Sequence, residues 1–232
     1  MQKRLLALVL LFACTQINAQ KKEWTSLFDG KTTSGWHTYG KDAVGEAWKV
    51  VDGTLMLDPS IKEGWQIKGG GDIVSNESYG DFHLQLEWKI SKKGNSGIIF
   101  FVQDEPKKYN YIWYTGPEMQ VLDNDGHADA KINKHRAGNL YDLVAGVEGA
   151  VKPVGEWYLV DIINEKGTLT LKLNGVTTVT TTLGDDAWKN LIKNSKFSKG
   201  ESPDFGKVFT GHIGLQDHGD QVWYRNIRIQ RL

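Results

Sequence analysis

The chain has 232 residues, with 28 Lys and Arg balanced by 28 Asp and Glu. This balance excludes the basic surplus of a nucleic-acid-binding protein. The single cysteine, Cys14, lies in the N-terminal apolar segment, so the remaining chain can form no disulfide, thiolate nucleophile or cysteine-ligated zinc site.

The N-terminal segment has the pattern of a secretory signal. Lys3 and Arg4 precede an apolar run too short to span a membrane, and Ala19 offers a small residue for cleavage. Removing 19 residues from 232 leaves 213, with 26 basic and 28 acidic side chains and a net charge of −2. Alternatively, residues 11–14 resemble the lipobox of bacterial lipoproteins, in which Cys14 would carry a lipid anchor. Both patterns predict export to the periplasm or the outside of the cell.

Alternation of apolar and polar residues predicts β-strands along the rest of the chain. Residues 82–90 show it best, because every second residue from Phe82 to Ile90 is apolar and those between are polar. The same pattern predicts strands over 48–57, 82–90, 97–102, 118–122, 157–163, 168–173, 176–182, 212–216 and 222–230.

The turns and the one helical segment fit a sandwich of two sheets. Asp52-Gly53, residues 165–167 and Asn174-Gly175 are typical hairpin turns. Residues 185–194 have helical spacing after an Asp cap. No linker or repeat interrupts residues 24–232, so we expect one all-β sandwich domain with one short helix.

Two long segments without alternation, 104–116 and 124–153, are expected to be functional loops. Trp113 and Tyr111 could stack on a sugar ring, whereas most of the nine tryptophans, including Trp48, Trp88 and Trp157, are expected in the core. Polar contacts to a ligand could come from the second loop, through His127, His135, Arg136 and Tyr141.

Carboxylates gather at one predicted strand. Glu118 and Gln120 share a face, and a bulge near Leu122 would bring Asp123 to the same face, as in the bulged catalytic strand of sandwich-fold β-glucanases. Such a pair would suit a retaining or an inverting glycosidase, depending on its separation. The alternative is that Glu118 and Asp123 hydrogen-bond loop backbone.

A second cluster ends the strand at 212–216, where His212, Gly214, Gln216 and His218 are expected to face away from the core. Beside Asp217 and Asp220, His218 could act as a base, an acid or a metal ligand, because its pKa lies near neutrality. The alternative is that it caps a turn. No serine-nucleophile elbow, Rossmann, P-loop or zincin motif is present.

Arg225 alternates in phase with the apolar residues of the last strand, which would direct it inward. An unpaired guanidinium cannot be buried there, so it needs an acidic partner, for which we favour Asp29, or a bulge that turns it outward.

Taken together, these motifs resemble the 3-keto-disaccharide hydrolase family over residues 24–232. The residues that carry the resemblance are Leu27–Lys31 with Gly35-Trp36, Tyr79–Phe82 with Leu86–Lys89, Asn95–Gly97, Glu118–Asp123, Tyr141–Leu143, Lys152–Trp157, Gly214–Gly219 and Arg225–Ile227. The resemblance implies a concanavalin A-like jelly-roll sandwich in a secreted protein. It also implies cleavage of glycosides that carry a ketone at sugar carbon 3.

A ketone at C3 acidifies the proton at C2, so the glycosidic oxygen can leave by elimination. Such a reaction needs a base, an acid and an electrophile for the enolate, which is either hydrogen-bond donors or a divalent metal whose ligands no spacing identifies. We expect Glu118, Asp123 and His218 as acid/base residues, with Gln120 and His127 on the substrate. The alternatives are a conventional glycoside hydrolase and a non-catalytic carbohydrate-binding module.

Overall fold

A computed structural model describes residues 23–147, 150–199 and 202–232. The predicted signal segment, with Ala19 and Cys14, lies outside the described residues. In the described part of the chain, no helix has the length and apolar character needed to cross a bilayer.

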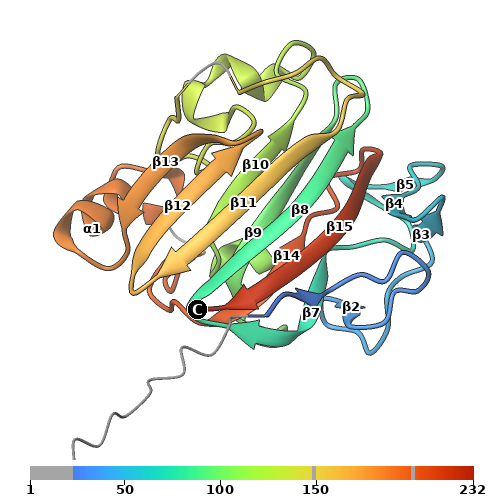
Figure 1. Cartoon of the computed structure of the whole chain (residues 1–232), viewed down its shortest axis with the longest axis horizontal. Helices are drawn as coiled ribbons and strands as arrows, with labels where there is room; N and C mark the ends of the chain where they lie inside the picture. The colour runs from blue at the N-terminus through green and yellow to red at the C-terminus, as the bar shows by residue number, and fades with distance from the viewer. Residues whose placement is uncertain (1–22, 148–149, 200–201) are drawn as a thin grey trace, which may run out of the picture.

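Two antiparallel sheets pack face to face (Figure 1). The larger has eight strands in the order β13-β12-β11-β8-β15-β4-β3, with β1 beside β15. Its strands are β1 (Thr25–Ser26), β3 (Trp48–Val51), β4 (Thr54–Leu57), β8 (Phe82–Ile90), β11 (Tyr158–Glu165), β12 (Thr168–Leu173), β13 (Val176–Thr182) and β15 (Val222–Arg231).

The smaller sheet has five strands in the order β10-β9-β14-β7-β2. Its strands are β2 (Trp36–Thr38), β7 (Ile73–Tyr79), β9 (Asn95–Val102), β10 (Glu118–Leu122) and β14 (Gly211–Leu215). A separate hairpin joins β5 (Lys62–Glu63) to β6 (Gln66–Ile67). Helix α1 (Asp186–Lys193) lies beside β13 at one end of the sandwich, and four short 3₁₀ helices cover 112–114, 128–131, 133–135 and 196–198 (Figure 1).

The core forms between the two sheets. Phe82 on β8 contacts Phe100 and Phe101 on β9, with ring centroids 6.4 and 5.8 Å apart. Within the larger sheet, Trp88 stacks on Tyr158 at 4.0 Å. Aromatic contacts of this kind bury large apolar areas and hold the layers together. The predicted jelly-roll sandwich with one short α-helix is therefore confirmed.

Most predicted strands are present, with some changes. Residues 48–57 form the hairpin β3–β4 around the expected Asp52-Gly53 turn. Asp185 caps α1 as expected, its side chain accepting the Trp188 N–H at 2.7 Å. Strand β7 was not predicted, because its buried and exposed residues do not alternate and its register against β14 shifts. The short strands β1, β2, β5 and β6 were also missed.

The predicted partner of Arg225 is wrong. Asp29 accepts backbone N–H groups of its own turn, whereas Arg225 donates to Glu87 on β8 at 2.6 and 3.0 Å. The alternative, a bulge, is present: the register shifts after Arg225, and Asn226 has φ +52°. Arg225 is thereby outside the core, with its guanidinium 3.9 Å from the ring centre of Trp157. Trp157 is half-buried at this surface, so its predicted place in the core is also wrong.

Candidate active site

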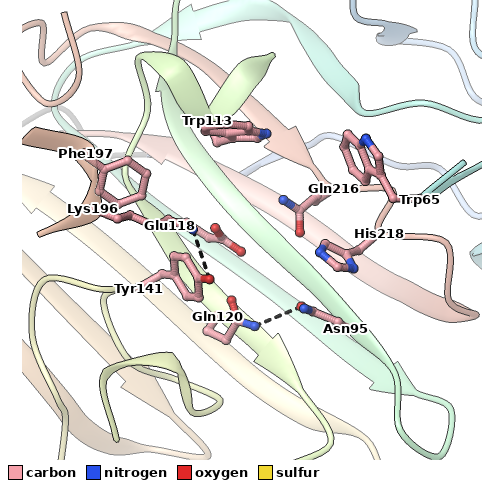
Figure 2. Close-up of a pocket in the computed structure, with 10 residues that line it drawn as sticks. All are labelled: Trp65, Asn95, Trp113, Glu118, Gln120, Tyr141, Lys196, Phe197, Gln216 and His218. Carbon is pink, nitrogen blue, oxygen red and sulfur yellow. Dashed lines mark hydrogen bonds between the residues drawn. The ribbon is translucent and has the colours of Figure 1, made fainter. Parts of the chain in front are cut away.

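A pocket of about 170 Å³ lies on the outer face of the five-stranded sheet. Strands β9 and β10 and the end of β14 form its floor, and loops supply its walls (Figure 2). Ten residues line it: Trp65, Asn95, Trp113, Glu118, Gln120, Tyr141, Lys196, Phe197, Gln216 and His218.

The register of β10 decides which of its side chains reach the pocket. Glu118 and Gln120 pair with Ile99 and Gly97 of β9 in a regular ladder, so the two share a face as predicted. The expected bulge near Leu122 is absent from this ladder, and that expectation is wrong. Asp123 instead follows the strand and accepts the N–H groups of Lys93 and Asp125, at 2.7 and 3.1 Å. It does not line the pocket.

Gly97 makes room for the Glu118 side chain. A Cβ at Gly97 would overlap the Glu118 carboxyl group and approach its Cγ to 2.9 Å. Strand β9 lies between β10 and β14, so this glycine forms the floor between Glu118 and the residues that follow β14. Only a residue without a side chain leaves the carboxyl lying flat over the sheet.

Glu118 is only 5% exposed, and none of its carboxyl oxygens has a hydrogen-bond partner among the described residues. Burial raises the pKa of Glu118 to about 8, partly opposed by the charge of Lys196 and reinforced by Asp72 and Asp129. Its carboxyl group therefore holds a proton at neutral pH. A neutral acid that points into a pocket is suited to proton donation.

His218 lies across the pocket from Glu118 (Figure 2). Burial lowers the pKa of His218, and the neighbouring His127 lowers it further, while Asp220 and Asp129 oppose the shift. The imidazole is therefore neutral at pH 7 and can accept a proton. Two titratable groups whose environments move their pKa values apart are the usual mark of an acid and base pair.

Asp217 fixes the position of His218. Its fully buried carboxylate accepts N–H groups from Ile67 (3.0 Å), Gly71 (2.8 Å) and Gly219 (2.9 Å). These bonds attach the β5–β6 hairpin to the end of β14. The attachment brings Trp65, at the tip of the hairpin, to 5.8 Å from the His218 ring, measured between ring centroids.

Polar groups on the pocket floor are available to a ligand. Gln120 donates to Asn95 Oδ1 at 2.9 Å, while its own Oε1 is buried without a partner among the described residues. Gln216, predicted to face away from the core, is buried in the pocket wall, and no hydrogen bond of its side-chain amide occurs within the described residues. A buried acceptor without a partner is costly unless a ligand satisfies it.

The predicted loop residues have different positions. Trp113 lines the pocket, stacked on Tyr111 with centroids 5.2 Å apart, and Tyr141 lines it too. His127 and Arg136 do not line it; His127 caps a short helix by accepting the Asp129 N–H at 3.1 Å. His135 is buried between two aspartates.

Sequence reasoning missed four residues of the lining. They are Trp65, Asn95, Lys196 and Phe197. Asn95 belongs to the Asn95–Gly97 motif, which carried the family resemblance but was given no role at the site. Trp65 lies in an unpredicted hairpin, and Lys196 and Phe197 follow the helix; no local pattern distinguishes them from ordinary surface and core residues.

The residues of the site do not fit a divalent metal, which the sequence analysis named as one of two options for the electrophile. Across 23–147, 150–199 and 202–232, no three His, Cys, Asp or Glu side chains gather as ligands. Asp123 and Asp217, two of the acids close to the site, are occupied by backbone N–H groups. Metal ligands need free lone pairs.

We expect Glu118→Gln to stabilise the protein at alkaline pH. The fold raises this pKa from 4.5 to about 8, so its contribution to stability is present below pH 4.5 and lost as the pH rises through 8. The melting temperature of the variant should exceed that of the wild type by about 5 °C or more at pH 9, with little difference at pH 4.5.

Glu87→Gln is the matched control, because the fold shifts the pKa of Glu87 in the opposite direction. Although burial favours the neutral form of Glu87, the bonds from Arg225 and Asn226 outweigh it and lower the pKa. This variant should be slightly less stable than the wild type at pH 7. A melting-temperature difference for Glu118→Gln that does not change between pH 4.5 and 9 would contradict the buried neutral acid.

Comparisons with known proteins identify the family and support the fold. Residues 23–230 match a family model described as a 3-keto-alpha-glucoside-1,2-lyase-like domain. The chain is 37% identical to a 3-keto-disaccharide hydrolase of Bacteroides thetaiotaomicron, over 94% of this chain and 81% of that protein. Both descriptions are of enzymes that cleave glycosidic bonds, which confirms the predicted class of activity.

Solved structures from Parabacteroides distasonis are similar as well. One, described as that of a candidate glycosyl hydrolase, is 30% identical, with a TM-score of 0.79, over 90% of this chain and 94% of that one. A second, at 24% identity and a TM-score of 0.67, covers 90% of this chain and all of that one and supports the fold alone. The chain therefore belongs to the 3-keto-disaccharide hydrolase family.

Proposed function

We propose that this protein cleaves 3-keto-glycosides by elimination, with Glu118 as the acid and His218 as the base. The observation that carries the proposal is that Glu118 and His218 line opposite sides of one pocket, where burial raises the pKa of Glu118 and lowers that of His218. The names of the family model and of the bacterial relative support a 3-keto sugar as the substrate.

The reaction proceeds in balanced steps. His218 removes the C2 proton, and the electron pair of that bond forms an enolate with its charge on the C3 oxygen. As the ketone re-forms, a C1–C2 double bond develops, the C1–O bond breaks and Glu118 protonates the departing oxygen. Water then adds across the unsaturated ketone to give the free 3-keto sugar, so the overall reaction is a hydrolysis. General acid and base catalysis at both positions lowers each barrier.

The pocket has polar and aromatic groups suited to one sugar ring. The free Oε1 of Gln120 can accept a hydrogen bond from a sugar hydroxyl, and Gln216 can donate or accept one. Trp113 and Trp65 on the walls offer ring faces to the C–H groups of the sugar.

The position of Asp123 argues against a conventional carboxylate pair. Its oxygens accept two backbone N–H groups, and it does not line the pocket that holds Glu118. We therefore leave Asp123 out of the catalytic set and assign it to the loop after β10. For the same reason we leave out His127 and Arg136.

We also propose that the protein is exported from the cytoplasm. The N-terminal sequence of Lys3 and Arg4 followed by an apolar run supports a secretory signal, with a lipid anchor at Cys14 as the alternative. Mass spectrometry of the mature protein from its native host would distinguish cleavage after Ala19 from acylation of Cys14.

The purified protein should cleave a 3-keto-glucoside and leave the parent glucoside intact. The measurement is chromatography of the product released from each of the two substrates, with and without a chelator. Cleavage of the parent glucoside would favour a conventional hydrolase. Binding without turnover of either would favour a carbohydrate-binding module.

The pH profile of kcat/KM should be bell-shaped. The acid limb should lie below 6.5, where His218 becomes protonated, and the alkaline limb near 8, where Glu118 loses its proton. Glu118→Gln should remove the alkaline limb and His218→Ala the acid limb, each with a loss of about 10²- to 10⁴-fold.

His37→Ala is the control, because His37 on β2 does not line the pocket. Full activity of both Glu118→Gln and His218→Ala would overturn the assignment.

Gly97→Ala should reduce kcat/KM about as much as Glu118→Gln while leaving the fold intact, because the added methyl group displaces the Glu118 carboxyl. Gly80→Ala is the matched control, since Gly80 lies in the β7–β8 turn and an added Cβ there meets the Thr210 hydroxyl at 3.1 Å and the Phe209 carbonyl oxygen at 3.9 Å. Activity and circular dichroism of both variants provide the test. A fully active Gly97→Ala variant would show that the position of Glu118 is not critical.

A further inference from the structure

We propose that the ammonium group of Lys196 is the electrophile that binds the C3 ketone oxygen and stabilises the enolate. This inference rests on the proposed function and assigns the component that elimination requires besides an acid and a base. Among the ten residues that line the pocket, Lys196 is the single Lys or Arg.

The Lys196 side chain reaches the pocket beside Glu118 (Figure 2). Its Nζ donates to the Tyr141 hydroxyl at 3.1 Å and lies 4.2 Å from the centre of the Tyr141 ring. No carboxylate of the described residues lies within ion-pair distance of Nζ. An ammonium group has three N–H donors, so two remain for a ligand.

A closed set of hydrogen bonds holds this lysine in place. Asp142 accepts the Lys196 backbone N–H at 2.6 Å with one oxygen and pairs with His135 Nε2 at 3.0 Å with the other. The Nδ1 of His135 pairs with Asp129 at 2.9 Å, and Asp129 accepts the Tyr141 hydroxyl at 3.2 Å. This series of hydrogen bonds begins at the Lys196 backbone N–H and ends at the Tyr141 hydroxyl, which the Lys196 Nζ also contacts.

The backbone of Asp142 has a strained conformation of the kind that is common at functional sites. Asp142 has φ +56°, a left-handed conformation that costs free energy for a residue other than glycine. Its carboxylate joins the 3₁₀ helix that contains His135 to the one that begins at Lys196. The fold therefore maintains a strained residue where it ties two loops together beneath the pocket.

The chemistry of the enolate explains why a cation is needed at this place. When His218 removes the C2 proton, negative charge develops on the C3 oxygen. The carboxyl group of Glu118 must donate its proton to the glycosidic oxygen, and the free oxygen of Gln120 is an acceptor. Lys196 is exposed at the edge of the pocket, so hydrogen bonds and not burial hold its ammonium group in place. A donor that is already held in position stabilises such a charge without having to reorganise during the reaction.

Lys196 also affects Glu118 in a way that can be measured. The charged groups that face Glu118 are Lys196, which lowers its pKa, and Asp72 and Asp129, which raise it. Removing the ammonium group should therefore move the alkaline limb of the pH profile to higher pH. A residue with only a structural role would not cause this shift.

The test compares Lys196→Met with Lys193→Met, an exposed lysine of helix α1 that does not line the pocket. With a 3-keto-glucoside, Lys196→Met should lose about 10²- to 10³-fold in kcat/KM, as removal of an oxyanion donor does. Its alkaline limb should lie above that of the wild type, and Lys196→Arg should recover part of the rate. Lys193→Met should behave as the wild type.

The outcomes separate the inference from the function on which it rests. If the wild type cleaves the 3-keto-glucoside and Lys196→Met retains activity within about threefold, the role of Lys196 is overturned while the function stands. A loss of activity with an unchanged alkaline limb and no recovery in Lys196→Arg also overturns it, since that pattern reports a structural role. Failure of the wild type to cleave the substrate overturns the function itself.

Discussion

The Glu118 carboxyl group lies over a glycine on the neighbouring strand, buried and without a hydrogen-bond partner among the described residues. This arrangement determines much of the chemistry of the pocket. Because water is largely excluded and Gly97 offers no polar atom in place of water, the carboxyl group keeps its proton to about pH 8. The same burial opposes stability at alkaline pH, a cost that a catalytic acid commonly imposes on the fold that holds it.

Three aspartates around the pocket have a structural role. Asp217 and Asp123 each accept several backbone N–H groups, and Asp142 accepts one as well as pairing with His135, and these bonds hold the loops around the pocket in place. Carboxylates that accept several such bonds form firm anchors. Through Asp217 the anchor acts on His218 and Trp65, and through Asp142 it acts on Lys196. His218 is thus supported by hydrogen bonds through Asp217, whereas Glu118, on the other side of a floor formed by β-strands, is placed by its strand and by the space over Gly97.

Charge is unevenly distributed across the pocket. Lys196 and Glu118 lie on one side, and His218 with the aromatic ring of Trp65 lies on the other (Figure 2). Burial also raises the pKa of Asp72 to about 7, and the carboxylate of Asp217 adds to that effect.

The sequence by itself determined the sandwich, because strict alternation on strands such as β8 leaves one face for the core whatever the topology. It also determined that Glu118 and Gln120 share a face, since a regular strand fixes the direction of every second side chain. The His218 candidate followed from its place after a strand in the same way. Local patterns are sufficient for these features, as they depend on residues close together in the chain.

Only the tertiary structure decided the rest. Asp123 was expected beside Glu118, and Arg225 beside Asp29, yet both depend on register and on a bulge that a single strand does not reveal. Lys196 and Trp65 join the site from segments 78 and 53 residues away from Glu118 along the chain, held by hydrogen bonds to Asp142 and Asp217. Contacts between such distant segments arise when the two sheets and their loops pack, so no local pattern of residues encodes them.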